Sequence, residues 1–343
     1  MALGEVNDAV LADLRARLGR AVAARHDGAR VTDLRPLTGG ASSLTFVAEV
    51  EGAPADEQTI VVKVAPPGLA PVRNRDVLRQ ARLMRALEGQ PRTLAPRTLL
   101  SDAGAPPEFP PLLAMDLVAG ECVEPVLAPK ADRPEPVTVR ARYLDAAALL
   151  ADLHRVSPAE VGLGGEPVVS LADEIDRWTR AFETVSEDLR GDYERCAAAL
   201  HASKPPALPP VINHGDYRLG NTLCSGEKVM AIIDWEIWSI GDPRVDMTWL
   251  TYFTDDAAHP ATEPIGPAGT PTSAEVIEAY ERARGSALPD LAWFEALTKY
   301  KEAAATALLI KRGRKAGTLQ PSMQRMAPAL PKMIEEALTI VGG

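Results

Sequence analysis

The residues best suited to chemistry lie in one short segment, His214 to Asn221, and in an aspartate that follows it. Asp216 and Asn221 are five residues apart, and Asp234 comes thirteen residues after Asn221. A carboxylate can accept the proton of a hydroxyl group, and Mg²⁺ prefers amide and carboxylate oxygens as ligands. The spacing predicts a tight loop followed by a hairpin, which would bring the three side chains to one point for phosphoryl transfer.

A lysine and a glycine-containing turn form a second set of candidate groups, suited to phosphate. Lys63 lies in the strand-like segment TIVVKVA, where it alternates with Val62 and Val64. The predicted turn between the two preceding strands consists of Gly39, Gly40, Ala41, Ser42 and Ser43. Simpler interpretations exist, because a strand lysine can be solvated, glycines serve any hairpin, and an aspartate can cap a turn. The order of the three features along the chain favours the functional interpretation.

The elements that must position these groups change character along the chain. Apolar spacing predicts a helix over residues 5–24 and another over 74–87, and alternation predicts strands at 31–37, 43–50, 59–65 and 112–118. Helical patterns dominate afterwards, over residues 140–156, 171–200, 274–284, 290–313 and 327–340. Four prolines between Pro125 and Pro136 follow a seam near Gly120. We therefore predict an α+β fold with a small β-rich lobe, residues 1–118, and a larger mostly helical lobe, residues 119–343.

Composition and charge exclude several classes of protein. The net charge is −10, and residues 1–116 are neutral, so the acidic excess lies in the remainder. A polyanion requires a basic face, so nucleic acid is not an expected partner. Neither a signal peptide nor a membrane span is predicted, and three widely spaced cysteines favour reduced thiols and a cytoplasmic location. The oligomeric state is not predicted.

The motifs taken together resemble a known superfamily. The stretch HGDYRLGN…IIDWEIWSIGDPRVDMTWL is similar to the signature of the aminoglycoside phosphotransferases and choline kinases, which have a protein-kinase-like fold. The resemblance extends to LTGGASSLTFVAEV, VVKVAP, MDLVAGE and AALLADLHRVSPAEVGLG, and covers roughly residues 35–315. It is strongest to the kinase-like domains found beside acyl-CoA dehydrogenases. The family pattern implies a two-lobed fold and transfer of a phosphoryl group to a small-molecule hydroxyl.

The resemblance also implies roles for individual residues. Asp216 would be the catalytic base, and Asn221 and Asp234 the ligands of Mg²⁺. Lys63 would contact the α- and β-phosphates of ATP or GTP, and the turn at residues 39–43 would cover them. The nucleotide base would be received by the backbone of Met115, Asp116, Leu117 and Val118. The residues expected to support the loop are His214, Arg218, Asp242 and Asp246, with Asp242 as the N-cap of the next helix.

One departure from the family pattern concerns the partner of Lys63. The glutamate that usually pairs with this lysine is replaced by Gln80, which can donate or accept a hydrogen bond but carries no charge. Asp76, one turn earlier, is a possible substitute. Gln80 leaves open a nucleotide-binding pseudokinase that acts as a scaffold, and a protein kinase is a second alternative class.

The acceptor is expected to be small and to be held by the helical lobe. Only seven residues separate Asp234 from Asp242, too few for the platform on which a protein kinase binds a peptide. The region around Trp178 and a loop at residues 255–272, expected to be mobile, are candidates for holding the acceptor. The acidic charge favours an amino sugar or amino alcohol, whereas the resemblance favours a hydroxyacyl compound.

Overall fold

The computed structural model describes residues 8–37 and 43–342, which form two compact units. The first unit contains the described part of residues 1–120 together with Met230–Ile237. The second contains Glu121–Val229 and Trp238–Gly343, of which the last residue is not described. The sequence-based division placed Met230–Ile237, which includes Asp234, in the second lobe. The contacts of the segment Met230–Ile237 group this segment with the first unit instead.

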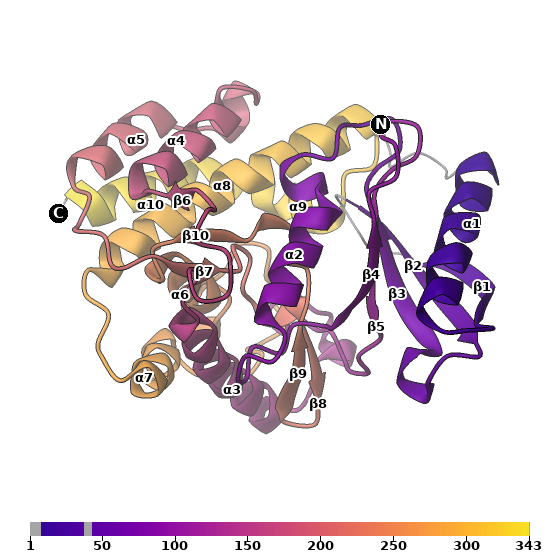
Figure 1. Ribbon diagram of the computed structural model, residues 1–343. Helices are drawn as coiled ribbons and strands as arrows, with labels where there is room; N and C mark the ends of the chain where they lie inside the picture. The colour runs from indigo at the N-terminus through magenta and orange to yellow at the C-terminus, as the bar shows by residue number, and fades with distance from the viewer. Residues whose placement is uncertain (1–7, 38–42, 343) are drawn as a thin grey trace. The chain divides into compact units, whose positions relative to one another are not determined.

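The first unit is built on an antiparallel sheet with the strand order β1-β2-β3-β5-β4 (Figure 1). Its strands are β1 (Arg30–Leu37), β2 (Leu44–Glu51), β3 (Thr59–Val64), β4 (Thr98–Asp102) and β5 (Leu112–Asp116). Four of these strands match predicted segments. The sequence prediction missed β4, whose residues TLLSD do not alternate between apolar and polar side chains.

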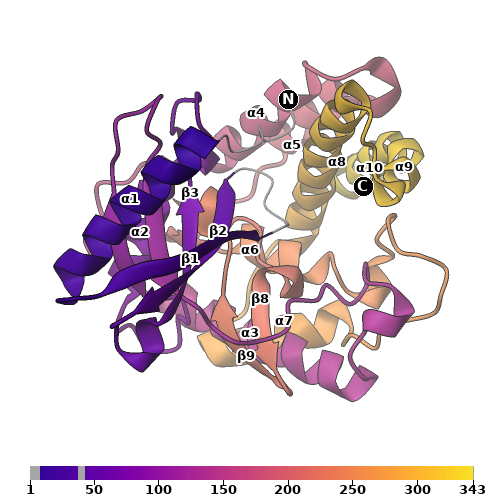
Figure 2. The same cartoon turned by 90° about the vertical axis from the view of Figure 1, so that its right-hand side faces the viewer.

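Two helices, α1 (Asp8–Arg25) and α2 (Val77–Leu87), cover opposite faces of this sheet (Figures 1 and 2). The α1 residues Leu14, Leu18 and Val22 are buried in one core cluster with alternate residues of the strands, such as Phe46 and Val62. Because side chains alternate along a strand, Lys63 lies on the other face of β3, which is the α2 side.

The second unit consists mainly of helices. They are α3 (Pro136–Arg155), α4 (Leu171–Phe182), α5 (Tyr193–Ala202), α6 (Arg244–Thr251), α7 (Ser273–Arg284), α8 (Leu291–Ala316), α9 (Pro321–Met326) and α10 (Leu330–Gly342). The prediction of one helical region over 171–200 is wrong, because the chain breaks between α4 and α5. There Gly191 takes a left-handed φ of 52°, and a Cβ on it would lie 3.0 Å from Pro331 Cα.

Short strands hold the segments that carry the motifs. In the second unit β10 (Ser239–Gly241) pairs antiparallel with β7 (Val211–Asn213) and parallel with β6 (Val168–Val169). The strands β8 (Thr222–Ser225) and β9 (Lys228–Ile232) form a two-stranded sheet. The segment from His214 to Asn221 therefore connects β7 to β8, and Asp234 follows β9.

Two properties of the whole chain follow from the described residues. Over residues 8–37 and 43–342, no helix has the length and apolarity needed to cross a membrane. Among the described residues, Cys122, Cys196 and Cys224 form no disulfide, and burial raises the pKa of Cys196 to about 12. A buried thiol of this kind is a packing residue rather than a nucleophile.

Candidate active site

The loop between β7 and β8 brings Asp216 and Asn221 into direct contact. Asn221 Nδ2 donates to Asp216 Oδ2 at 2.8 Å and to the Asp216 carbonyl oxygen at 2.8 Å. A short 3-10 helix, Leu219–Asn221, turns the chain so that residues five apart can meet. With its nitrogen donating to Asp216, the amide oxygen of Asn221 is the atom suited to a cation.

Two further donors hold the other oxygen of the Asp216 carboxylate. Trp249 Nε1 of α6 donates to Oδ1 at 2.6 Å, and Arg218 Nε donates to the same atom at 3.3 Å. The indole and the guanidinium therefore approach the same carboxylate oxygen, and the bond from Trp249 is the shorter of the two. Trp249 is buried, with 5% exposure, and its polar edge serves the candidate base.

The start of the loop is anchored to α6 by a buried carboxylate. Asp246 accepts hydrogen bonds from the backbone N–H groups of His214 at 2.6 Å and of Gly215 at 2.8 Å. Burial alone would raise the pKa of Asp246, but the nearby His154, His214 and Lys301 hold it below its ordinary value of 3.8. The predicted supporting role of Asp246 fits these contacts. His214 Nδ1 accepts the backbone N–H of Asp216 at 3.2 Å.

Asp242 forms a second anchor, although not as the predicted N-cap. The helix α6 begins one residue later than expected, with Pro243 in the N-cap position. The Asp242 carboxylate still accepts the Arg244 backbone N–H at 3.0 Å, and it pairs with the fully buried Arg244 guanidinium at 2.7 Å. Asn213, the last residue of β7, donates to the Asp242 carbonyl oxygen at 3.1 Å. These bonds fix β7 against the start of α6.

Sequence reasoning missed a buried glutamate beneath the loop. Glu124 Oε2 accepts the Gly220 backbone N–H at 3.0 Å and lies 3.5 Å from Arg218 Nη1, while its Oε1 accepts the Tyr143 hydroxyl at 3.2 Å. Burial raises the pKa of Glu124. Burial alone would lower the pKa of Arg218, but Asp216 and Glu124 raise it above its ordinary value. Arg218 thus stays a cation between two carboxylates.

In the first unit, Lys63 forms an ion pair with Asp234. Lys63 Nζ lies 2.9 Å from Asp234 Oδ1, and the two side chains are 10% and 41% exposed. Asp234 has a left-handed φ of 66°, a conformation that aspartate tolerates better than most residues and that concentrates at functional sites. Trp235 closes the turn by donating to the Ile232 carbonyl oxygen at 2.7 Å. The two residues predicted to serve phosphate and metal are therefore adjacent.

Asp76 and Gln80 were the two residues predicted as partners of Lys63, and each lies in a different environment from the one expected. Asp76 is the N-cap of α2, where its Oδ1 accepts the backbone N–H groups of Leu78 at 3.1 Å and Arg79 at 3.0 Å. The suggestion that Asp76 substitutes for the missing glutamate is therefore corrected. Gln80 is 2% exposed, and its Nε2 has no hydrogen-bond partner among the described residues.

The predicted nucleotide-contacting backbone lies only partly within the described residues. Residues 39–42 of the turn are outside them, whereas Ser43 is described and is buried. Strand β2, which follows the turn in the sequence, pairs its Thr45 with Lys63 of β3. Met115 and Asp116 end β5, and Leu117 and Val118 follow it just before the boundary at Gly120.

Other candidates from the sequence have structural roles. His154 of α3 is buried, and its Nδ1 lies 2.7 Å from the Tyr280 hydroxyl, while its Nε2 lies 3.7 Å from Asp246 Oδ2. Hydrogen bonds hold the two ends of the loop at 255–272 together. Asp255 accepts them from the backbone N–H groups of Ala268, Gly269 and Thr270. Trp178 is buried and donates to Glu174 at 3.0 Å.

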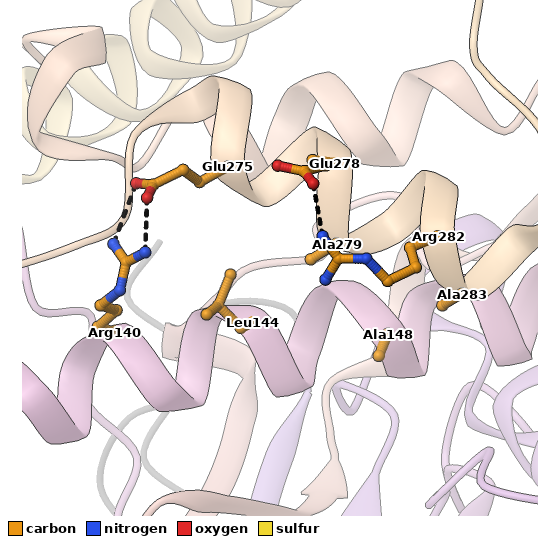
Figure 3. Close-up of a pocket in the computed structure, with 8 residues that line it drawn as sticks. All are labelled: Arg140, Leu144, Ala148, Glu275, Glu278, Ala279, Arg282 and Ala283. Carbon is orange, nitrogen blue, oxygen red and sulfur yellow. Dashed lines mark hydrogen bonds and ion pairs between the residues drawn. The ribbon is translucent and has the colours of Figure 1, made fainter.

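A groove of about 360 Å³ lies between α3 and α7, away from the predicted residues (Figure 3). Its charged side chains pair with each other: Arg140 with Glu275 at 2.6 Å and Arg282 with Glu278 at 2.5 Å. The floor between the pairs is apolar, with Leu144 and alanines. None of its lining residues carries one of the predicted roles.

Comparison with known proteins identifies the family of this chain and a related protein. The model of a family described as "Phosphotransferase enzyme family" matches residues 33–297. Acyl-CoA dehydrogenase family member 11 of Pongo abelii is 25% identical over 263 residues, which is 72% of this chain but 32% of that protein. The chain thus spans about a third of the length of that relative.

Solved structures show the same fold. A candidate aminoglycoside phosphotransferase of Ralstonia eutropha superposes with a TM-score of 0.73 at 20% identity, covering 95% of this chain and 98% of that one. A choline/ethanolamine kinase family protein of Mesorhizobium loti gives 0.57 at 18% identity, with 96% and 95% covered. The predicted α+β, protein-kinase-like fold and the predicted superfamily resemblance are confirmed.

Proposed function

Because the chain belongs to the phosphotransferase enzyme family, we propose that it transfers the γ-phosphoryl group of ATP or GTP to a hydroxyl group of a small molecule. The acceptor oxygen bonds to the γ-phosphorus, the bond from that phosphorus to the β–γ bridging oxygen breaks, and the hydroxyl proton passes to a base. The observation that carries this proposal is the contact between Asp216 and Asn221. It joins a proton acceptor and a cation ligand on one loop.

Asp216 is the base in this mechanism. Trp249, Arg218 and Asn221 direct hydrogen-bond donors at its two oxygens. These bonds fix the carboxylate in one orientation. Its remaining lone pairs therefore already have a fixed direction when the substrate hydroxyl binds. Such pre-organisation matters in phosphoryl transfer, because catalysis there is mostly positioning and electrostatic stabilisation.

The proposed reaction also requires a nucleotide and Mg²⁺. In the part of the chain that the structure describes, three or more His, Cys, Asp or Glu side chains do not gather into a metal cluster. Mg²⁺ in nucleotide sites is usually held by one or two protein groups with phosphates and water, so Asn221 and Asp234 suffice as protein ligands. When bound, the ion neutralises charge on the phosphates. Lys63 binds the α- and β-phosphates, which compete with Asp234 for its ammonium group.

The acceptor is small because the chain lacks room for a peptide platform after Asp234. The seven residues before Asp242 are taken up by the 3-10 helix Trp235–Ile237 and by β10, which is paired on both sides. The acidic charge of the helical unit favours an amino sugar or amino alcohol. The likeness to an acyl-CoA dehydrogenase family member favours a hydroxyacyl compound. Both classes are candidates for the acceptor.

The decisive experiment measures nucleotide-dependent phosphorylation by the purified chain. Each acceptor class is supplied with Mg²⁺ and ATP or GTP, and the product is identified by ³¹P NMR. Asp216→Asn should lower kcat on the order of 10²–10⁴-fold, the contribution of a positioned base. The matched control is Asp192→Asn, whose side chain is 56% exposed and lies before α5. Turnover of Asp216→Asn within about threefold of the parent contradicts the assigned role.

A second candidate function is a nucleotide-binding scaffold without turnover. The observation that favours it is the uncharged Gln80, together with the pairing of Lys63 with Asp234 rather than with α2. The scaffold predicts nucleotide binding by calorimetry with no Mg²⁺-dependent formation of ADP or GDP. Phosphorylation of any small hydroxyl compound that requires Asp216 rejects the scaffold.

A further inference from the structure

A buried lysine lies next to the loop that carries Asp216. Lys301 of α8 is 5% exposed, and its Nζ donates to the carbonyl oxygen of Gly215 at 2.5 Å. Burial lowers the pKa of Lys301, whereas Glu174, Asp246 and Asp216 act in the opposite direction. A cation is costly to bury, so a lysine in this position is expected to serve a purpose that an apolar residue could not.

The ammonium group of Lys301 also faces an aromatic ring. Its Nζ lies 3.9 Å from the centroid of the Trp249 ring. The N–H edge of that indole donates to Asp216 Oδ1 at 2.6 Å. The three groups therefore form a continuous chain from a cation, through the face of an indole, to the carboxylate of the candidate base.

We propose that Lys301 and Trp249 are positioning residues for Asp216, with the charge of Lys301 acting on the carboxylate through the Trp249 indole. This inference rests on the proposed phosphotransferase function. A cation over an indole withdraws electron density from the ring, which makes the N–H a stronger donor, and linked polar contacts strengthen one another in a low dielectric. The hydrogen bond from the indole also fixes the angle of the carboxylate.

Core packing is the competing interpretation, and it makes different predictions. A packing residue tolerates replacement of an indole N–H, provided that the ring is retained. A positioning residue does not, because the hydrogen bond to a charged group is lost. The chain offers a matched control in Trp293 of α8, which is also buried and whose Nε1 donates to the Leu200 carbonyl oxygen at 3.3 Å.

The kinetic test compares Trp249→Phe with Trp293→Phe. In Trp249→Phe the ring remains available to Lys301, but Asp216 loses a donor, so kcat should fall about 10- to 100-fold while KM for the nucleotide stays within about twofold. Trp293→Phe should keep the parent kcat. Equal kcat values for the parent and Trp249→Phe, or equal losses in the two variants, overturn the inference. A parent without turnover refutes the proposed function, and the inference with it.

The contribution of Lys301 is tested by Lys301→Met, which retains most of the side-chain volume without the charge. Its kcat should fall on the order of tenfold, and the double variant with Trp249→Phe should lose less than the product of the two single losses. Multiplicative losses show that the two residues act independently and overturn the proposed chain. Urea unfolding of each variant identifies those that fail to fold.

A spectroscopic arm does not depend on turnover or on removing Trp249. The chain has five tryptophans, so its ¹H–¹⁵N spectrum has few indole signals. The Trp249 signal is identified by its loss in Trp249→Phe, or by residue-specific labelling if that variant does not fold. This signal should lie downfield. It should move upfield in both Asp216→Asn and Lys301→Met, while the Trp293 signal stays in place. If the chemical shift of the Trp249 signal is unchanged in either variant, the inference is overturned, whatever the kinetics show.

Discussion

Replacing Asp246 by Asn should separate the anchoring of the catalytic loop from the chemistry of Asp216. Both carboxylate oxygens of Asp246 are in use, since each accepts one backbone N–H of His214 or Gly215. The side chain is fully buried. Asn keeps one oxygen and turns an NH₂ group toward the second N–H, which leaves a buried donor without an acceptor. Such a group costs about 1–3 kcal/mol, and the loss of a charged acceptor adds to this, so we expect destabilisation of roughly 2–4 kcal/mol.

The assay is urea unfolding followed by tryptophan fluorescence, because Trp178, Trp238, Trp249 and Trp293 all report on the second unit. The pKa of Asp246 lies below 3.8 in the folded chain, so its contribution is complete at neutral pH and is lost as the pH falls through the lowered pKa. The difference between parent and variant should therefore shrink below pH 3.8.

The same substitution should lower kcat, because a loosened loop no longer fixes Asp216. Glu275→Gln is the matched control: it also changes a carboxylate to an amide, in the capping box of α7, and should cost stability without changing kcat. An Asp246→Asn protein with parental stability at pH 7 refutes the assignment of Asp246 as the loop anchor. So does a difference in stability that grows as the solution is acidified.

Three further predictions concern the first unit. The hydrogen bond from Arg25 lowers the pKa of Glu57 from 4.5 to about 2, so Glu57→Gln should destabilise this unit by up to roughly 3 kcal/mol at pH 7. In thermal unfolding, the difference in stability between the parent and Glu57→Gln should shrink as the pH falls from 4.5 to 2. A difference that stays constant over this range contradicts the pairing of Arg25 with Glu57. Asp76→Ala should cost about 1 kcal/mol in urea unfolding through loss of the α2 cap, equally in the parent and in Gln80→Glu; unequal losses mean that Asp76 does more than cap. Gln80→Glu should maintain or raise kcat/KM for the nucleotide by offering Lys63 a charged partner, and a lowered value argues against that pairing.

The sequence by itself determined the parts of the site that depend on local spacing. Asp216 and Asn221 are five residues apart on a loop between two short strands, and that distance along the chain is enough to predict that they meet. Likewise, alternation in TIVVKVA placed Lys63 on one face of a strand, because the direction of a side chain in a strand follows from its position. The fold class followed from the change from alternation to helical periodicity along the chain.

The tertiary structure alone decided which distant residues complete the site. Glu124, Trp249 and Lys301 approach the loop from separate segments of the second unit, and nothing in their neighbouring sequence distinguishes them from a surface glutamate, a core tryptophan or a surface lysine. The pairing of Lys63 with Asp234 joins residues 171 positions apart. A local pattern records which face of an element is apolar, but it does not record which other element packs there. That choice is made by packing over the whole chain, and it sets the partner of each buried charge.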